Sequence, residues 1–180
     1  TTEVARSTVE GMQLLAVIAP MIIAAVGVFL SLIGIFLVRT KDGASMKDLL
    51  HSLGLGTNTA AILIAVATFP ILYLLGIDNW VGVSFSVISG LAAGVIIGQA
   101  TEYYTSQSYK PTREISAASK TGAATVIIKG IGTGMISTCI PVLTISVAIM
   151  LSYLCANGFD MSMSAESIQL GLYGIGIAAV

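Results

Sequence analysis

The sequence predicts an all-α protein, a polytopic bundle of transmembrane helices with four full spans and the start of a fifth. Its 180 residues are 56% hydrophobic and only 9% charged, whereas a soluble domain carries roughly 25% charged residues. A bilayer core about 30 Å thick takes about 20 residues of helix, and several apolar stretches reach that length. Since lipid offers no partner to a free backbone amide, each span should be a helix.

Four apolar stretches are long enough to cross the membrane, and a fifth is shorter. The full spans cover residues 11–38, 58–77, 80–104 and 121–155, and the partial helix covers 166–180. The chain has no initiator methionine, and its last residues lie within the fifth stretch. We therefore expect residues 1–180 to be a single transmembrane segment of a larger protein.

Two connections have a predicted shape. Only the short sequence GIDNW (76–80) separates the second span from the third, so these two spans should form a tight antiparallel hairpin. After the first span, Leu49, Leu50 and Leu53 fall near one helical face among polar residues. Because Ser is a good N-cap, we expect a short surface helix that opens at Ser45.

Prolines mark four points of the chain. Pro20, Pro70 and Pro141 lie inside predicted spans, where each removes a helix hydrogen bond and should kink its helix. Pro111 lies in the polar connection between the third and fourth spans, where we expect it to break any helix.

Lys and Arg residues predict the orientation of the chain. Two connections, which four crossings would put on one side, hold Arg39, Lys41, Lys47, Lys110, Arg113 and Lys120. The opposite side has Arg6 and the acidic Asp78. Because loops rich in Lys and Arg face the cytoplasm, the sequence predicts an integral multi-pass membrane protein whose loops near 39–57 and 105–120 are cytoplasmic.

Small residues predict close helix packing. Gly90, Gly94 and Gly98 recur every four residues of the third span and share one helical face, which lets another backbone approach closely. We expect Gly94 to lie against a neighbouring helix, so that Gly94→Leu would destabilise the bundle. The GIGTG sequence at 130–134 lacks the GxGxxG spacing of a nucleotide-binding loop, and we interpret it as flexible or closely packed helix.

Residues that could carry chemistry are few. No His, Cys, Asp or Glu group has metal-ligand spacing, and no nucleophile is assembled with a His and an acid. Lys129 lies about two turns into the fourth span, where it could snorkel to the interface, form a structural ion pair, or serve a substrate. Glu102 closes the third span, and we expect it to form a salt bridge with Lys129 or Arg113.

The polar connection between the third and fourth spans contains motifs that suggest a family. They are GQATEYYTS (98–106), YKP (109–111) and SKTGAAT (119–125). These elements resemble the membrane-bound, ion-pumping inorganic pyrophosphatases, in which a GxxTEYYTS element ends one helix and an SxTGAAT element starts the next. The resemblance covers residues 90–141 by motif, and the rest of the chain by hydropathy and spacing.

The resemblance implies a pump with two concentric rings of helices, which hydrolyses pyrophosphate at a cytoplasmic Mg²⁺ site and moves H⁺ or Na⁺ outward. This chain would supply mainly outer-ring scaffold and the beginning of one inner-ring helix. Its partners would be the lipid bilayer, the remaining helices of the pump, a second copy in a homodimer, and pyrophosphate in the parent protein, with no nucleic acid. Mg²⁺ would be bound outside this chain, because the repeated Asp motifs of the family do not occur in it.

The resemblance gives the motif positions no catalytic, cofactor-binding or metal-binding role. These positions are Glu102, Tyr103, Tyr104, Thr105, Lys120, Thr121, Gly122, Thr125 and Lys129. The chain alone should neither hydrolyse pyrophosphate nor pump ions, because Mg²⁺ and pyrophosphate need several carboxylates. Two other interpretations stay open: a fragment of a secondary transporter with broken, Gly-rich helices, and a non-catalytic membrane scaffold. Asp-rich helices in the flanking sequence would favour the pyrophosphatase over both.

The charge distribution gives a testable prediction about sidedness. In a background without Cys139 and Cys155, single cysteines at Ser45 and Ser108 should be protected from a membrane-impermeant thiol reagent added to intact cells. A cysteine at Asn79 should react. Labelling of the two loop positions without labelling of Asn79 would contradict the orientation.

Overall fold

The computed structural model describes residues 2–39, 43, 45–76, 79–158 and 165–180. Within these ranges the chain is helical, and no strand is present. The helices are α1 (Thr2–Leu37), α2 (Met46–Leu74), α3 (Trp80–Thr105), α4 (Lys110–Ala118), α5 (Ala123–Ser137), α6 (Cys139–Ala156) and α7 (Ala165–Ala178).

Four helical stretches of the described residues are long and apolar enough to cross a membrane, which confirms the predicted fold class. They are Leu14–Leu37 in α1, Met46–Leu74 in α2, Trp80–Ala118, which joins α3 to the polar α4, and Ala123–Ala156, which joins α5 to α6. The apolar part of α7, Ser167–Ala178, is shorter.

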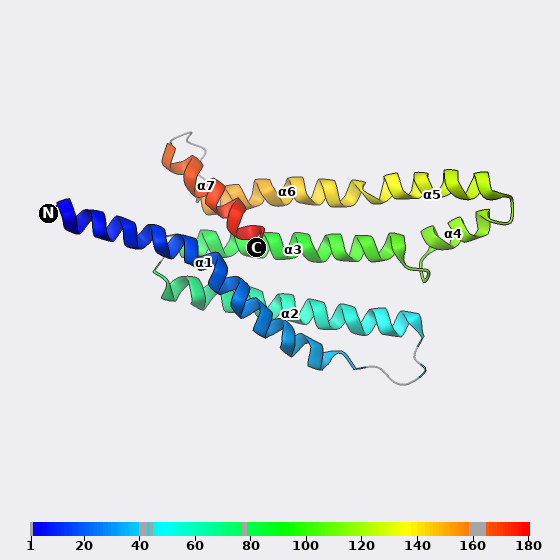
Figure 1. Cartoon of the computed structure of the whole chain (residues 1–180), viewed down its shortest axis with the longest axis horizontal. Coiled ribbons are helices and arrows are strands. Elements are labelled where there is room, and N and C mark those ends of the chain that lie inside the picture. The colour runs from blue at the N-terminus through cyan, green and yellow to red at the C-terminus, as the bar shows by residue number, and fades with distance from the viewer. Residues whose placement is uncertain (1, 40–42, 44, 77–78, 159–164) are drawn as a thin grey trace.

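The long helices lie side by side, with α3 in the middle (Figure 1). α3 packs between α2 and α6, α1 crosses α2, and α7 lies across α3 and α6. The end of α1 and the start of α2 lie at the same end of the bundle as the connection from α3 to α5, as alternating crossings require (Figure 1). Asn79 and Asn157 flank helix ends at the other end, whereas Lys41 and Asp78 fall outside the described residues.

The hairpin of α2 and α3 forms as predicted. Gly76 in the turn has a φ of 68°, a left-handed conformation that glycine adopts without strain. Aromatic side chains then join the two helices edge to face. The ring centroids of Phe69 and Phe85 are 6.2 Å apart, and those of Tyr73 and Trp80 are 5.5 Å apart. These contacts fix the register of the hairpin.

The predicted surface helix that opens at Ser45 is the first part of α2, so the second span begins earlier than expected. Asp48 closes a capping box, in which its carboxylate accepts a hydrogen bond from the Ser45 N–H at 3.2 Å. The helix then continues without a break through the buried Gly56. A Cβ at Gly56 would lie 3.1 Å from the carbonyl oxygen of Gly34 in α1, so close contact with α1 favours one continuous helix.

The fourth span is divided into α5 and α6 at Thr138. Pro141 has no N–H to donate to the carbonyl of Ser137, and it therefore interrupts the helical hydrogen bonds. The hydroxyls of Ser137 and Thr138 donate to carbonyls three residues earlier, at 2.7 and 2.9 Å. α6 resumes in nearly the same direction (Figure 1). Pro20 and Pro70 lie inside α1 and α2, which continue past them.

Hydroxyl groups and a glycine join α3, α6 and α7. Ser86 donates to the carbonyl of Ser152 at 2.6 Å, and the hydroxyls of Ser89 and Ser152 lie 2.7 Å apart. Gly174 of α7 faces the same place, because a Cβ there would meet the Ala156 side chain and the Ser86 hydroxyl. Helices in lipid associate through such small residues and interhelical hydrogen bonds.

The glycine face of α3 contacts a neighbour at one of its three positions. A Cβ at Gly90 would collide with the carbonyl oxygen of Ala178 in α7. Nothing in the described part of the chain lies within 4 Å of a Cβ placed at Gly94 or Gly98. Within the described residues no helix lies against Gly94, so the expected packing of Gly94 against a neighbouring helix stays a prediction.

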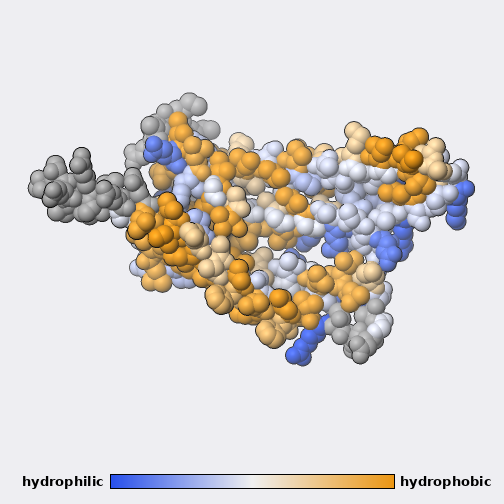
Figure 2. Space-filling view, in the orientation of Figure 1, coloured by the Kyte–Doolittle hydropathy of each residue, from blue (hydrophilic) through white to orange (hydrophobic). Residues whose placement is uncertain are grey.

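Much of the apolar surface faces outward (Figure 2). The buried hydrophobic cluster is small and consists of Ala19, Ile23, Leu72, Val83, Val87 and Ile177. Large side chains on the outside, such as Phe36 and Leu74, are 80% and 82% exposed. Apolar surface of this extent meets lipid or further helices, as expected for a membrane segment.

Gly174 provides a test of the packing of α3, α6 and α7. Gly174→Ala should lower the free energy of unfolding by about 1–3 kcal/mol, because the added methyl group overlaps the Ala156 side chain. Gly176→Ala is the matched control on the same helix, since nothing in the described residues lies within 4 Å of its Cβ position. Denaturation followed by circular dichroism in detergent gives both values. Equal losses in the two variants would contradict the packing.

Candidate functional site at the junction of α3, α4 and α5

The connection from α3 to α5 folds into a short helix. α3 ends at Thr105, and the Ser106 N–H donates to the carbonyl of Glu102 at 2.9 Å. α4 begins at Lys110 and has Pro111 in its first turn. The expectation that Pro111 breaks any helix is wrong, because first-turn N–H groups have no partner within the helix and proline loses nothing there.

Hydrogen bonds to backbone carbonyls hold α4 against the end of α3. The Thr112 hydroxyl donates to the carbonyl of Tyr104 at 3.1 Å. The Arg113 Nε–H donates to the carbonyl of Gln107 at 3.2 Å. The short helix is therefore fixed both to α3 and to the loop that precedes it.

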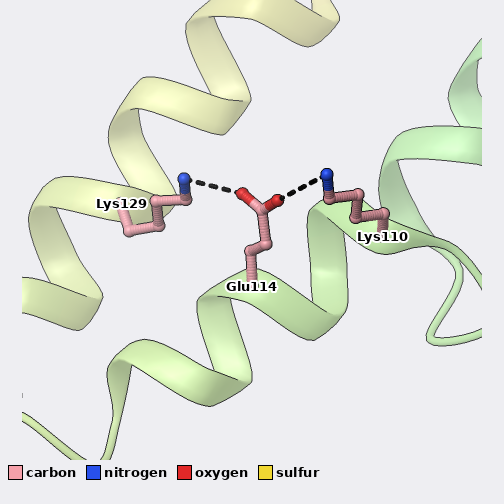
Figure 3. A network of polar contacts seen from close by, with 3 residues as sticks. All are labelled: Lys110, Glu114 and Lys129. Carbon is pink, nitrogen blue, oxygen red and sulfur yellow. Dashed lines mark ion pairs between the residues drawn. The ribbon is translucent and has the colours of Figure 1, made fainter.

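Lys129 of α5 points toward an acidic residue of α4 (Figure 3). Its Nζ lies 2.8 Å from Oε2 of Glu114, and the Nζ of Lys110 lies 3.7 Å from Oε1 of the same carboxylate. The ion pair expected for Glu102 is therefore wrong, because Lys129 pairs with Glu114 and Arg113 bonds a carbonyl. The contacts favour the structural ion pair among the alternatives for Lys129.

The two lysines change the acidity of Glu114. The hydrogen bond from Lys129 acts most strongly, followed by the charge of Lys129, and the charge of Lys110 adds to them. Together they hold the pKa of the Glu114 carboxyl below its ordinary value of 4.5. α4 is polar and lies beyond the apolar part of α3, so this carboxyl is outside the membrane span. At neutral pH it is charged and links α4 to α5.

Tyrosine rings lie next to the ion pairs. The ring of Tyr103 contacts those of Tyr104 and Tyr109, with centroids 5.2 Å apart in both pairs. A cavity of about 260 Å³ lies between the side chains of Tyr103 and Tyr104 and the ion pairs. This volume is below the roughly 300–1,000 Å³ of small-molecule pockets, and both lysines already face a carboxylate. The arrangement suits a structural junction more than an anion site.

The TGAAT motif forms the turn from α4 into α5. Gly122 has a φ of 134°, a backbone conformation that residues with a side chain rarely adopt. It is the N-cap residue of α5. The Thr121 hydroxyl donates to the carbonyl of Ala118 at 2.7 Å. The Thr125 hydroxyl lies 2.8 Å from that of Thr121 and 2.7 Å from the Gly122 carbonyl. The two threonines thus provide partners for carbonyls where one helix ends and the next begins.

The remaining motif positions lie away from the ion pairs. Glu102 is half-buried on another face of α3, in the wall of a cavity that α1, α2 and α7 also line. The Thr105 hydroxyl donates to the carbonyl of Thr101 at 2.7 Å within α3. Lys120 is exposed, and neither ion pair of the described residues includes it. The structure therefore gathers the two tyrosines and the lysine of α5, but neither Glu102 nor Lys120.

The junction does not fit a metal ion. Among the described residues, no three His, Cys, Asp or Glu side chains could hold one together. Glu114 already faces two lysines, and Glu102 lies elsewhere. Mg²⁺ binds through carboxylates together with water and substrate phosphates, and this arrangement of residues does not supply that set.

Comparison with known proteins covers the whole chain. A family described as inorganic H+ pyrophosphatase matches residues 1–180. The chain belongs to this family. The resemblance carried by the motifs of the α3–α5 connection is thereby confirmed.

Three curated relatives of the chain are named as pyrophosphate-energized pumps. The chain is 60% identical over 169 residues to a putative K(+)-stimulated pyrophosphate-energized sodium pump of Bacteroides thetaiotaomicron, covering 94% of this chain and 22% of the relative. It is 37% identical over 164 residues to a protein of the same name from Clostridium tetani, covering 91% and 23%. It is 36% identical over 166 residues to a K(+)-insensitive pyrophosphate-energized proton pump of Methanosarcina mazei, covering 92% and 23%. The chain thus spans less than a quarter of each of these relatives.

Glu114 was not among the partners predicted for Lys129. A signal was present, because Lys110 and Glu114 are four residues apart, which is the spacing of an ion pair on one helical face. The signal depends on Pro111 being a first-turn residue of α4, because a helix broken at Pro111 would not place Lys110 and Glu114 on one face.

The ion pairs give a test of the junction in the full-length protein. Glu114→Gln should lower the melting temperature at neutral pH, because Lys129 loses its charged partner. Lys110→Gln is the matched control and should have almost no effect, since its Nζ is 3.7 Å from the carboxylate and its side chain is 82% exposed. Equal effects of the two changes would contradict the assignment of Lys129 as the main partner.

The difference in stability between wild type and Glu114→Gln should also depend on pH. Because the pKa of Glu114 is lowered in the folded protein, its contribution is fully present above the ordinary value of 4.5 and is lost as the pH falls through the folded-state pKa. Melting temperatures at neutral pH and below 4.5 measure this difference. A difference that grows toward acid pH would show that the charged carboxylate does not stabilise the fold.

Proposed function

We propose that the parent of this chain is a pyrophosphate-energised cation pump, an integral membrane enzyme that couples hydrolysis of pyrophosphate to transport of Na⁺ or H⁺. The observation that carries the proposal is the family match over residues 1–180. The relatives at 60%, 37% and 36% identity are all named as pyrophosphate-energized pumps. The four spans of this chain form part of the membrane region of such a pump.

Of the two cations, Na⁺ is the one that the relatives favour. The relative with 60% identity is named as a K(+)-stimulated sodium pump, whereas the proton pump of Methanosarcina mazei is 36% identical. We extend both properties, Na⁺ transport and stimulation by K⁺, to the parent of this chain.

This segment serves mainly as scaffold on the outside of the pump. Its motif residues form contacts within the segment, such as those of Lys129 with Glu114 and of Thr125 with the turn before α5. The described carboxylates are not gathered into a metal site, so residues elsewhere in the parent would bind Mg²⁺ and pyrophosphate. Bound Mg²⁺ would neutralise charge on the phosphoryl oxygens during hydrolysis.

The basic connections of the segment would face the cytoplasm. Arg39 and Lys47 flank the first connection, and Lys110 and Arg113 lie in the connection from α3 to α5, at the same end of the bundle. Basic loops of this kind remain cytoplasmic. The outward apolar surface leaves room for lipid, for the remaining helices of the pump and for a second copy in a homodimer (Figure 2).

The proposed activity is tested with the full-length protein in inverted membrane vesicles. Pyrophosphate and Mg²⁺ should release phosphate, load the vesicles with Na⁺, and do both faster when K⁺ is added. Lys110→Gln should leave hydrolysis close to wild type, because this residue makes only one long, exposed ion pair. Uptake of H⁺ in place of Na⁺ would overturn the choice of ion. Na⁺ movement that needs no pyrophosphate would favour a secondary transporter, and an absence of hydrolysis would contradict the enzyme.

A further inference from the structure

The fourth span changes character at Thr138, which lies between α5 and α6. In α6, Ser152 and Ala156 are buried, and the Ser152 hydroxyl lies 2.7 Å from that of Ser89 in α3. In α5, none of the described residues 123–137 is buried. The segment therefore holds one half of this span firmly against α3 and leaves the other half outside its core.

The glycines of α5 show the same difference. Nothing in the described part of the chain lies within 4 Å of a Cβ placed at Gly130, Gly132 or Gly134. In α7, by contrast, a Cβ at Gly174 would meet both α6 and α3. Helices in lipid associate where such close contacts form, so the kind of contact that holds α7 in place is missing from the described surroundings of these glycines.

α4 and α5 form a hairpin, residues 110–137, which extends past the end of α3 (Figure 1). Its two arms are tied to each other. The Nζ of Lys129 in α5 lies 2.8 Å from Oε2 of Glu114 in α4. The Thr125 hydroxyl donates across the turn to the carbonyl of the last residue of α4 at 3.0 Å. The other side-chain hydrogen bonds of residues 116–125 also stay within the hairpin in the described chain, so the two arms form one body.

A space separates the base of the hairpin from α3. It is a cavity of about 260 Å³, and its lining includes Tyr103 and Tyr104 of α3 and Thr133 and Ile136 of α5. Closely packed interiors resist displacement, because their side chains leave few voids. The cavity therefore leaves room for α5 to move relative to α3.

We propose that residues 137–141 form a hinge about which the hairpin swings as one body relative to α3 and α6. Pro141 has no N–H to donate to the carbonyl of Ser137, so the helical hydrogen bonds are interrupted where the firmly held half of the span meets the hairpin. Sharp bends of more than about 20° in helices occur at prolines. The 15 residues of α5 span about 22 Å, and a swing of about 20° would move the far end of α5 by about 8 Å.

Two hydrogen bonds join α4 to the residues before it and must be exchanged during the swing. The Thr112 hydroxyl donates to the carbonyl of Tyr104 at 3.1 Å, and the Arg113 Nε–H donates to the carbonyl of Gln107 at 3.2 Å. Both lie beyond the apolar part of α3, where water replaces a lost hydrogen bond and the net cost is small. The swing carries the basic side chains of α4 with it, and thus changes where positive charge lies at this end of the bundle.

Distances between spin labels in the full-length protein test the hinge. The protein is placed in lipid nanodiscs in a cysteine-free background, in which Cys139 and Cys155 are replaced by Ala, and cysteine pairs are labelled and measured by double electron–electron resonance. One label stays at Val81 in α3, and the second is placed at Ala124 on the hairpin or at Leu143 in α6; all three positions are exposed. The pair of Val81 and Leu143 is the matched control. Distances to Ala124 should spread about 8 Å more widely than distances to Leu143.

Pro141→Ala tests the position of the hinge. The alanine N–H can donate to the carbonyl of Ser137, which restores a helical hydrogen bond and should narrow the Val81–Ala124 distribution toward the width of the control pair. Pro70→Ala is the matched variant, because it also removes a proline from inside a span but leaves residues 137–141 unchanged. It should leave the widths of both distributions as they are in the wild type.

A Val81–Ala124 distribution as narrow as that of the control pair would overturn the swing, and this comparison decides even where Pro141→Ala does not fold. A broad distribution that Pro141→Ala leaves unchanged, or that Pro70→Ala narrows equally, would overturn the assignment of the hinge to residues 137–141. The distances are measured without pyrophosphate, so the hinge and the proposed function are tested separately.

Discussion

The close contact of α3 with α6 and α7 is the constraint on which the rest of the segment depends. Helices in lipid gain nothing from burying apolar surface, because lipid tails are as apolar as their side chains. They need points of close approach, and here these are glycines. A Cβ at Gly82 would collide with the Cys155 carbonyl, and one at Gly174 with the Ala156 side chain. With α3 held in the middle, its two ends determine where the α2 hairpin and the α4 junction lie.

The ion pair at the far end of α3 gives a charged partner to Lys129, which lies in an apolar span. A lysine in an apolar span is costly unless it reaches water or a partner. α4 brings Glu114 to the place where Lys129 leaves α5. The two side chains are 41% and 46% exposed, and pairs of this exposure stabilise proteins little. The pair therefore matters more for the position of α4 relative to α5 than for the stability of the whole segment.

The spans could be predicted because they depend on the length of apolar sequence alone, whereas helix ends depend on contacts that the sequence does not show. α2 continues through Gly56 because Gly34 of α1 lies against it. The sequence around Gly56 does not show which residue of another helix will lie there. The prediction that Pro111 breaks any helix was wrong for another reason. Proline can end a helix or begin one, and its effect depends on its position in the helix. The junction residues Tyr103 and Lys129 were identified as motif positions, but their partner Glu114 depends on the existence of α4.

A glycine face can be recognised from its spacing, but the spacing does not say which helix lies against each glycine. The same pattern in α3 meets α7 at Gly90 and open space at Gly94. Whole helices show the same limit, because an apolar sequence does not reveal how much of a helix is buried within the segment. The apolar windows of α1 and of α5–α6 are 11% buried, and even that of the central α3 is 28% buried. Surfaces this open face lipid or further helices. The contacts within the segment therefore hold its helices in register and leave most of their apolar surface facing outward.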